Sequence, residues 1–319
     1  MKQINFGKLG SVSKLSLGGA GIGQVWGKTT RTESISTILE AVENGITLLD
    51  MGNYGNGEAE LAVGEAFSGN IPDNLKLTTK CLIGICEPSK IYELLDKSLT
   101  RSLSRMKRDY VDIFFMHNGI VQDGEKTTQN NSYRSVFDNI IVETFEKFIK
   151  DGRIKSWGIT GIGEPNALIQ MLKENPRPDY IQVVSNLLDS PGSLYKFAGS
   201  PKPRIIMNEA TKANVTILGI RPVQAGALTT KIDRSLPENH PEMIDFNHLT
   251  KFREFAKKIN MSPALLAHRY ALSMEHVSTV VLGVKNRIEL QECLAAEKLG
   301  PLDSNIINQI DNIVADFIH

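Results

Sequence analysis

The stretch Val111-Asp112-Ile113-Phe114-Phe115-Met116-His117 is a short run of branched and aromatic residues that ends in an imidazole. A run of this length and composition predicts a buried β-strand. The segments on either side, Ile91–Met106 and Phe137–Ile149, place their apolar residues at helical spacing instead. One face of the first helix would carry Leu94, Leu95, Leu99, Leu103 and Met106. Helix, strand and helix in this order form the repeating unit of a parallel sheet.

The same alternation extends from near Lys14 to near Ala296. Eight apolar segments predict strands: Leu15–Leu17, Thr47–Asp50, Lys76–Lys80, Val111–His117, Ile154–Thr160, Tyr180–Asn186, Thr216–Pro222 and Thr279–Gly283. Eight strands that alternate with helices favour a parallel sheet closed on itself, the (β/α)8 or TIM barrel of the α/β class. We expect one such domain over residues 1–319, because no Pro- or Ser-rich linker divides the chain.

Three segments fall outside the eightfold pattern. Met1–Val12 contains the turn Lys8-Leu9-Gly10-Ser11 and predicts a β-hairpin that caps the bottom of the barrel. Asp303–Phe317 has helical spacing and predicts an extra C-terminal packing helix. Thr229–Asn247 has no clear period and predicts a long loop, which would shape the substrate pocket together with Trp26 and Asn118–Asn131.

Composition excludes several classes of protein. Lys plus Arg and Asp plus Glu both total 36, so the formal net charge is zero, and 41% of the residues are hydrophobic. A balanced charge argues against a nucleic-acid or membrane partner. The N-terminus lacks a signal-peptide pattern, and the three cysteines lack metal-ligand spacing. We therefore expect a cytoplasmic protein with reduced thiols and no metal site, whose oligomeric state the sequence leaves open.

Ionisable residues stand at the ends of three predicted strands: Asp50, Lys80 and His117, with Tyr54 in the loop after Asp50. Taken singly, each has an ordinary structural role as a cap, a salt-bridge partner or a hydrogen-bonded histidine. Together at one barrel mouth they form an acid–base group. We expect the ammonium to lower the phenol pKa from about 10 and the carboxylate to keep the ammonium charged. Such a group can supply the proton that a carbonyl oxygen needs when a hydride reaches its carbon.

Three stretches resemble signatures of the aldo-keto reductases: Asn44–Asp50 with Tyr54–Glu60 and Gly64, Asp109–Ile113 with His117, and Gly152–Thr160. The similarity extends from Asn5-Phe6-Gly7 to the end of the eighth helix. It implies an NAD(P)-dependent oxidoreductase that moves a hydride between nicotinamide and a small carbonyl or alcohol substrate. An aldose or another aldehyde is the implied substrate class.

The resemblance also implies roles by position. Tyr54 would be the general acid/base, supported by Lys80 and Asp50, and His117 would position the substrate oxygen. The implied cofactor residues are Gly19, Ala20, Asp50, Thr160, Gln182, Arg221, Gly283, Lys285 and Glu289. Thr160 and Gln182 would face the nicotinamide amide, and the segment Gly283–Glu292 would hold the adenosine half.

The sequence departs from the family pattern at four places. Tyr54 follows Asp50 by four residues, where the family usually has five. Thr160-Gly161 replaces a Ser-Asn pair, Ile220 replaces a ring-stacking aromatic residue, and Asn118-Gly119 replaces Trp-Pro. Gly158–Gly161 and Val281–Asn286 instead resemble the branch that contains L-galactose dehydrogenases and aldose 1-dehydrogenases. That branch oxidises a sugar C1 hydroxyl, generally with NAD.

Glu289 bears on the choice of cofactor. It falls where many NADP-using members of the family have an arginine near the adenosine ribose. A carboxylate there accepts hydrogen bonds from ribose hydroxyls and repels a 2′-phosphate. Lys285 and Arg287 lie close enough in the sequence to bind that phosphate, so we expect NAD or NADP, with NAD favoured.

Two alternatives remain open at the level of sequence. The short Asp50–Tyr54 spacing is also compatible with a cofactor-binding homologue that has impaired catalysis and acts as a sensor. In the other alternative Lys80 is a Schiff-base nucleophile, as in barrel aldolases. Asp50 argues against this second alternative, because it keeps the amine charged.

Overall fold

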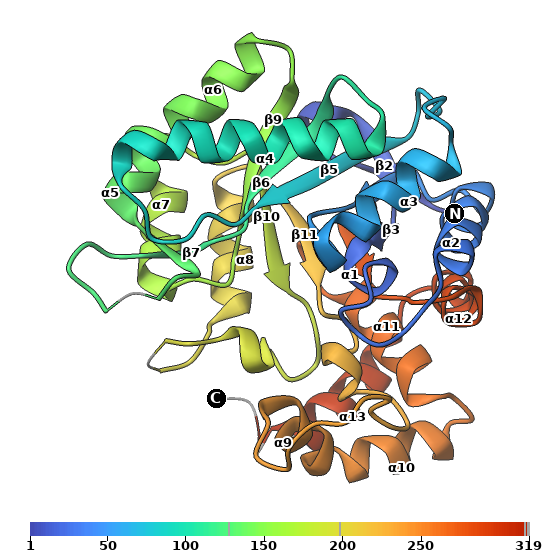
Figure 1. Cartoon of the computed structure of the whole chain (residues 1–319). Coiled ribbons are helices and arrows are strands. Elements are labelled where there is room, and N and C mark those ends of the chain that lie inside the picture. Colours follow the sequence, from blue (N-terminus) through green and yellow to red (C-terminus); the bar gives the residue numbers. More distant parts are fainter. Residues whose placement is uncertain (127, 198, 316, 318–319) are drawn as a thin grey trace.

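Eight short parallel strands close into one barrel in the computed structural model, which describes residues 1–126, 128–197, 199–315 and 317 (Figure 1). The barrel strands are β3 (Leu15–Gly18), β4 (Leu48–Asp50), β5 (Lys76–Cys81), β6 (Val111–Met116), β9 (Ile154–Thr160), β10 (Tyr180–Val184), β11 (Thr216–Ile220) and β12 (Thr279–Leu282). They pair in chain order, and β12 returns to β3 with Val281 opposite Ser16. This confirms the predicted (β/α)8 fold. Each predicted strand coincides with an observed one to within two residues at either end.

Helices surround the barrel on its outer side (Figure 1). They are α1 (Gly19–Ile22), α2 (Arg31–Glu43), α3 (Glu58–Ala66), α4 (Ile91–Met106), α5 (Arg134–Val136), α6 (Val142–Lys150), α7 (Pro165–Lys173), α8 (Pro203–Lys212), α9 (Pro241–His248), α10 (Thr250–Lys258), α11 (Pro263–Ser273), α12 (Arg287–Leu299) and α13 (Ser304–Val314). A π-helical turn, Phe137–Ile141, joins α5 to α6. Within the described residues, no helix has the length and apolarity needed to span a bilayer.

The N-terminal hairpin seals the end of the barrel at which the strands begin. Strands β1 (Gln3–Asn5) and β2 (Ser11–Ser13) pair antiparallel, and Phe6 between them is fully buried. Its ring lies 4.9 Å from that of Tyr180, the first residue of β10. The Tyr180 hydroxyl donates to the Phe6 carbonyl oxygen over 2.9 Å. These contacts confirm the hairpin cap.

Helix α4 shows how the pattern of apolar residues sets its orientation. Leu95, Leu99, Leu103 and Met106 are buried, as predicted, because steps of four and three residues keep them on one face. Leu94, which we expected on the same face, is 38% exposed. It lies a full 100° around the helix from Leu95 and so points partly to solvent.

The expected loop Thr229–Asn247 contains the start of a helix. Helix α9 begins at Pro241, which occupies the first helical position. Proline favours that position because its missing N–H has no partner there and its φ already suits a helix. Helices α9, α10 and α13 lie together in Figure 1, next to the segment that follows β11. Helix α13 confirms the predicted C-terminal packing helix, whereas α9 was not predicted.

Candidate functional site

The predicted acid–base residues meet at the end of the barrel where the strands finish. Lys80 of β5 lies with its Nζ 2.8 Å from Oδ2 of Asp50, the last residue of β4, and both side chains are almost fully buried. The same Nζ donates to the Met51 carbonyl oxygen over 2.5 Å. Neighbouring parallel strands carry these residues in adjacent register, with Asp50 opposite Thr78, so the ion pair follows directly from the strand order.

The other oxygen of Asp50 is held from two sides. Its Oδ1 accepts hydrogen bonds from the Thr78 hydroxyl over 2.7 Å and from Nε2 of Gln182 over 2.8 Å. Gln182 lies on β10, in register with Thr160 of β9. The family resemblance predicted that Gln182 faces the nicotinamide amide. In the structure its amide group also belongs to the network around Asp50.

Tyr54 points into the barrel despite its short spacing from Asp50. The Lys80 Nζ lies 5.4 Å from the centre of the Tyr54 ring, close enough for its charge to lower the pKa of the Tyr54 hydroxyl against the effect of burial. The His117 ring meets the Tyr54 ring edge-on, with centroids 6.0 Å apart. All four predicted residues therefore share one cluster.

Glycines allow the short loop to turn the ring inward. Gly23, at the end of α1, lies so close to Tyr54 that a Cβ on Gly23 would be 2.5 Å from the tyrosine Cβ. After Tyr54, the residues Gly55, Asn56 and Gly57 have φ values of 60°, 56° and 97°. These left-handed conformations suit glycine and are tolerated by asparagine.

The three titratable partners affect one another unequally. Burial raises the pKa of the Tyr54 hydroxyl above its ordinary value, and the nearby Lys80 ammonium opposes this without reversing it. The expected net lowering of this pKa is therefore wrong for the protein without cofactor. Burial alone would lower the pKa of Lys80, but the interactions with Asp50 and Tyr54 raise it by more, so the pKa of Lys80 is raised.

Burial, with a further contribution from Lys80, lowers the pKa of His117 to about 4. At neutral pH the phenol and the imidazole are thus uncharged and the ammonium is charged.

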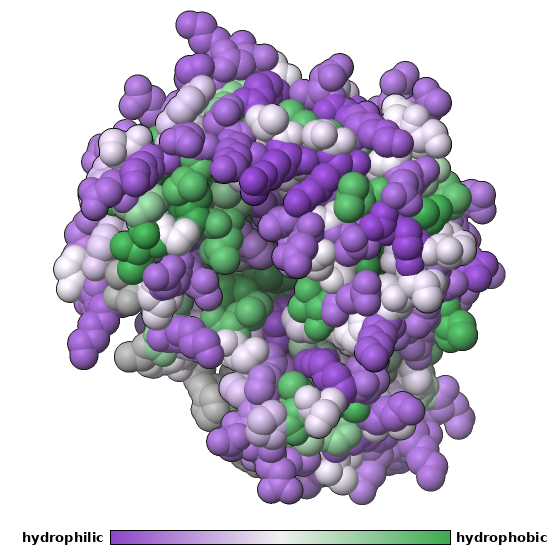
Figure 2. Space-filling model, in the orientation of Figure 1, coloured by the Kyte–Doolittle hydropathy of each residue, from purple (hydrophilic) through white to green (hydrophobic). Residues whose placement is uncertain are grey.

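A cavity of about 390 Å³ opens over this cluster. Figure 2 shows a hollow with apolar walls on one face of the molecule. Among the four acid–base residues, Asp50, Tyr54 and His117 reach the cavity surface, and Lys80 lies behind them. Every residue that the resemblance implied for the cofactor also lines it: Gly19, Ala20, Asp50, Thr160, Gln182, Arg221, Gly283, Lys285 and Glu289. The structure therefore gathers these residues in one place, and their roles toward a cofactor stay predictions.

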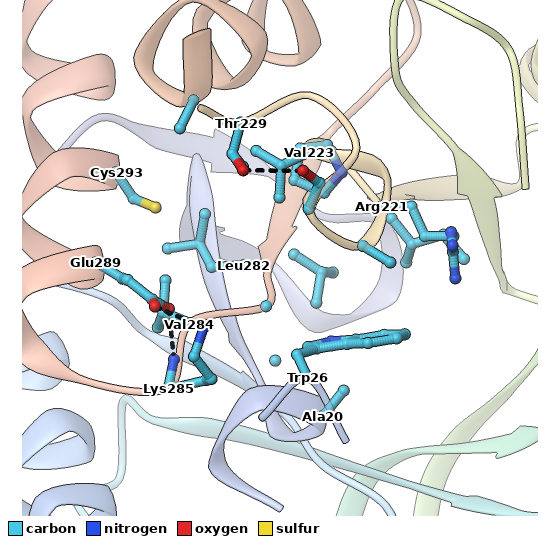
Figure 3. A pocket seen from close by; sticks show the side chains of 18 of the residues that line it. Ala20, Trp26, Arg221, Val223, Thr229, Leu282, Val284, Lys285, Glu289 and Cys293 are labelled. Atoms are coloured by element: carbon cyan, nitrogen blue, oxygen red, sulfur yellow. Dashed lines mark hydrogen bonds and ion pairs between the residues drawn. The ribbon is translucent and has the colours of Figure 1, made fainter. Parts of the chain in front are cut away.

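At one end of the cavity, Lys285 pairs with two carboxylates, of which Figure 3 labels Glu289. Its Nζ lies 2.7 Å from Asp233 and 2.6 Å from Glu289, and its backbone N–H donates to Glu289 over 2.9 Å. Arg287 faces away and pairs with Glu33 of α2 at 3.0 Å. Both cations that were candidates for a 2′-phosphate are thus already paired with carboxylates.

Arg221 forms a buried network that the sequence did not reveal. Its Nη2 lies 2.7 Å from the buried Glu242 of α9, and its Nε donates to Gln224 over 2.8 Å. The guanidinium lies 5.5 Å from the centre of the Trp26 ring. Among the described residues, its Nη1 is buried without a hydrogen-bond partner. Arg221, Gln224 and Ala225 have φ values of 58°, 47° and 50°, so this turn is conformationally strained.

The cavity walls match the sequence expectation in part. Trp26 and the segment 229–234 contribute, as expected. None of the described residues of Asn118–Asn131 does. Asn118 instead forms two hydrogen bonds with the backbone of Ile83. Ile162 and Leu194 supply wall residues in their place.

Sequence reasoning also missed the far end of the cavity. His268 of α11 and Cys293 of α12 both line it, with the cysteine Sγ 3.3 Å from the histidine Nε2. Burial raises the pKa of Cys293 well above its ordinary value. Each of the two residues fits the apolar face of its own helix, so the sequence carried no separate signal for a cavity wall.

Comparison with known proteins agrees with this geometry. The model of the aldo/keto reductase family matches residues 14–315. The chain is 26% identical to the uncharacterised oxidoreductase YqkF of Bacillus subtilis, over 91% of this chain and 90% of that one. It is 24% identical to L-galactose dehydrogenase of Arabidopsis thaliana, over 98% and 95%.

Solved structures share the same fold. The holo form of aldo-keto reductase AKR11C1 from Bacillus halodurans superposes with a TM-score of 0.74 and 23% identity, covering 98% of this chain and 96% of that one. The glycerol dehydrogenase AKR11B4 from Gluconobacter oxydans gives a TM-score of 0.72 and 20% identity, covering 99% and 96%. Because the family model spans nearly the whole barrel, this chain belongs to the aldo/keto reductase family.

Proposed function

We propose that this oxidoreductase transfers a hydride between a nicotinamide cofactor and an aldose or a similar small carbonyl or alcohol, with Tyr54 as general acid/base. The observation that supports this most directly is the position of the Tyr54 ring, whose centre lies 5.4 Å from the Lys80 Nζ and 6.0 Å from that of His117. A proton donor and a neutral imidazole then face the part of the cavity where a carbonyl oxygen would bind, and a cation lies behind the donor.

Each residue has a distinct part in the proton transfer. The nicotinamide ring, when bound, supplies or accepts the hydride. The Tyr54 hydroxyl gives its proton to the carbonyl oxygen during reduction, and the Lys80 ammonium stabilises the phenolate that remains. Asp50 keeps Lys80 charged, and neutral His117 donates a hydrogen bond that orients the oxygen. Oxidation of an alcohol runs the same steps in reverse.

The residues at the cavity suit a dinucleotide. The cavity extends from Tyr54 and His117 to Glu289 in the first turn of α12, and its volume of about 390 Å³ lies in the range of small-molecule sites. Gly19 and Gly283 directly follow neighbouring strands and line the cavity, and a Cβ on Gly283 would approach the Trp26 ring to 3.2 Å. Arg221 also lines the cavity, and its Nη1 is buried without a hydrogen-bond partner among the described residues.

The surroundings of Arg221 favour a neutral polyhydroxylated substrate over an anionic one. Glu242 already balances the charge of the Arg221 guanidinium, which therefore attracts a strongly charged group less than an unpaired cation would. The nearby Trp26 ring supplies an apolar face against which C–H groups of a sugar pack. The names of L-galactose dehydrogenase and glycerol dehydrogenase, both proteins to which this chain is similar, agree with such a substrate.

NAD is the cofactor that the charges around Lys285 favour, within a family that generally uses NADPH. Asp233 and Glu289 already neutralise Lys285, and Arg287 is turned toward Glu33. A 2′-phosphate would meet two carboxylates near one cation, whereas ribose hydroxyls can donate hydrogen bonds to Glu289. We further propose that the protein acts in the cytoplasm, where its three free cysteines stay reduced.

The variant Tyr54→Phe tests the proposal. Removal of the hydroxyl should lower kcat by at least about 10²-fold, the scale of a lost general acid. Cofactor affinity, followed by tryptophan fluorescence, should stay within about twofold, because the cofactor residues keep their positions. The variant Tyr133→Phe, which removes an exposed hydroxyl bonded to the Glu125 carbonyl, is the matched control and should keep wild-type kcat.

The same measurements separate the alternatives. A sensor would bind NADH or NADPH and turn over none of a panel of aldoses, methylglyoxal and aromatic aldehydes, in both the wild type and Tyr54→Phe. A Schiff-base enzyme would trap substrate on Lys80 under borohydride, which the raised pKa of that amine disfavours. Absence of any nicotinamide binding at millimolar concentration would refute the proposal and the sensor alternative together.

A further inference from the structure

A polar cluster outside the barrel wall holds the loop that carries Tyr54. Glu60 of α3 is fully buried, and its Oε1 accepts a hydrogen bond of 2.6 Å from the Thr79 hydroxyl. Its Oε2 lies 2.9 Å from Nη1 of Arg105, in the last turn of α4. The same Nη1 donates to Oδ1 of Asn53 over 2.6 Å. Arg105 thereby joins two helices to the residue that precedes Tyr54.

The turn after Tyr54 also rests on Arg105. The guanidinium lies against Gly57, where a Cβ atom would overlap it. Gly55, Asn56 and Gly57 all have positive φ. A run of such conformations persists only where the surrounding structure holds it in place. Arg105 supplies that support from the outer side of the loop.

Strand β5 connects this outer cluster to the acid–base group inside the barrel. Successive side chains of a strand point to opposite faces. Thr78 and Lys80 therefore point inward and contact Asp50. Thr79, between them, points outward and donates to Glu60. Three consecutive residues thus connect the carboxylate inside the barrel with the carboxylate outside it.

We propose that Arg105, held by Glu60, is a positioning residue for Tyr54, an inference that rests on the proposed role of Tyr54 as general acid/base. The loop is one residue shorter than the family pattern, so the path of its backbone decides whether the ring reaches Lys80. Arg105 fixes that path by holding Asn53 directly before the tyrosine and by filling the space against the turn that follows it. We call Arg105, Glu60 and Asn53 the outer clamp.

The variant Asn53→Ala tests the outer clamp without disturbing the ion pair between Arg105 and Glu60. The double variant Arg105→Met/Glu60→Met removes the clamp and leaves no uncompensated buried charge. The matched control is Arg153→Met. It breaks the 2.5 Å contact between Arg153 and Asp96, a residue of α4 that is distant in sequence from the Tyr54 loop.

We expect kcat to fall roughly 10- to 100-fold in the double variant and several-fold in Asn53→Ala, because a displacement of about 1 Å is enough for such losses. Cofactor affinity should stay at the wild-type value, and Arg153→Met should keep wild-type kcat.

The conservative variant Arg105→Lys separates positioning from folding. Lysine keeps a charge beside Glu60 but lacks the planar guanidinium that fills the space against Gly57. We expect a thermal midpoint near that of the wild type and a kcat clearly below it. Wild-type kcat in Arg105→Lys, Asn53→Ala and the double variant, with changes in thermal midpoint alone, would make the clamp purely structural and overturn the inference.

Crystal structures of Arg105→Lys and Asn53→Ala give a readout that does not depend on turnover. We expect the loop 53–57 to shift and the Tyr54 hydroxyl to leave Lys80. A Tyr54 ring still in contact with Lys80 in both variants would overturn the inference. Absence of turnover in the wild-type protein would refute the proposed function instead, and the position of Tyr54 in these structures would still decide the role of the clamp.

Discussion

The Lys80 ammonium lies 2.8 Å from the Asp50 carboxylate, and the two side chains are only 2% and 4% exposed. A buried charge that loses its partner is strongly destabilising. We therefore expect Lys80→Met to lower the free energy of unfolding by about 3–5 kcal/mol, measured by urea denaturation. The double variant Asp50→Leu/Lys80→Met should recover most of that loss, because it buries no lone charge. A loss below about 1 kcal/mol in the single variant would show that the remaining hydrogen bonds of Asp50 suffice.

Acidification should destabilise the protein partly through His117. Its pKa in the folded protein is about 4, below the value of about 6.5 in an unfolded chain. Between these values the unfolded chain binds more protons, so stability falls as the pH drops from about 6.5 to 4. The contribution is at most on the order of 3 kcal/mol.

The variant His117→Phe should lose less stability than the wild type over that pH range, measured by thermal unfolding. Part of the pH dependence of stability should remain in this variant, because burial also lowers the pKa of His268. The exposed His276 provides the control, since His276→Gln should follow the wild-type curve. Identical pH dependence in His117→Phe and wild type would mean that His117 does not titrate as described.

Glu289 should set the preference between the two cofactors. In Glu289→Arg, Lys285 loses one of its two carboxylate partners and a second cation is added. We expect the Kd for NADPH to fall at least about tenfold, equivalent to roughly 1.4 kcal/mol, with little change for NADH. Glu297→Arg, the same charge change at the far end of α12, is the control, and Lys2 is its partner there. Equal effects of the two variants would indicate a general charge effect instead of local recognition.

The hairpin cap should contribute to stability without affecting chemistry. Phe6 is fully buried against Tyr180, so Phe6→Ala should cost about 3–5 kcal/mol of unfolding free energy. At temperatures where the variant stays folded, kcat should equal that of the wild type, because the cap lies at the opposite end of the barrel from Tyr54. A large fall in kcat without a loss of stability would show that the two ends are coupled.

The barrel could be predicted from sequence because each strand carries its own signal. A run such as Val111–Met116 is buried on both sides and reads as strand without knowledge of its neighbours. The same holds for Asp50, Lys80 and His117, whose places at strand ends follow once the strands are located. Strand order then brings them together by geometry alone.

The features that were missed depend on residues far apart in the sequence. Whether the Tyr54 ring turns inward depends on Gly23 and Arg105, and spacing alone gives no sign of either contact. Arg221 donates a hydrogen bond to Glu242, which lies 21 residues later in the sequence. The sign of the Tyr54 pKa shift also required the degree of burial, which outweighs the nearby ammonium. Helix α9 is different, because Pro241 offered a local signal for its start.

One wall of the cavity comes from a later part of the chain than the outer clamp does. Leu194, Arg221 and the segment 229–234 follow β10 and β11, whereas the outer clamp and β5 lie within residues 53–105. Exchange of the later loops would therefore change the shape that a substrate meets, while Asp50, Tyr54, Lys80 and His117 all stay within residues 50–117.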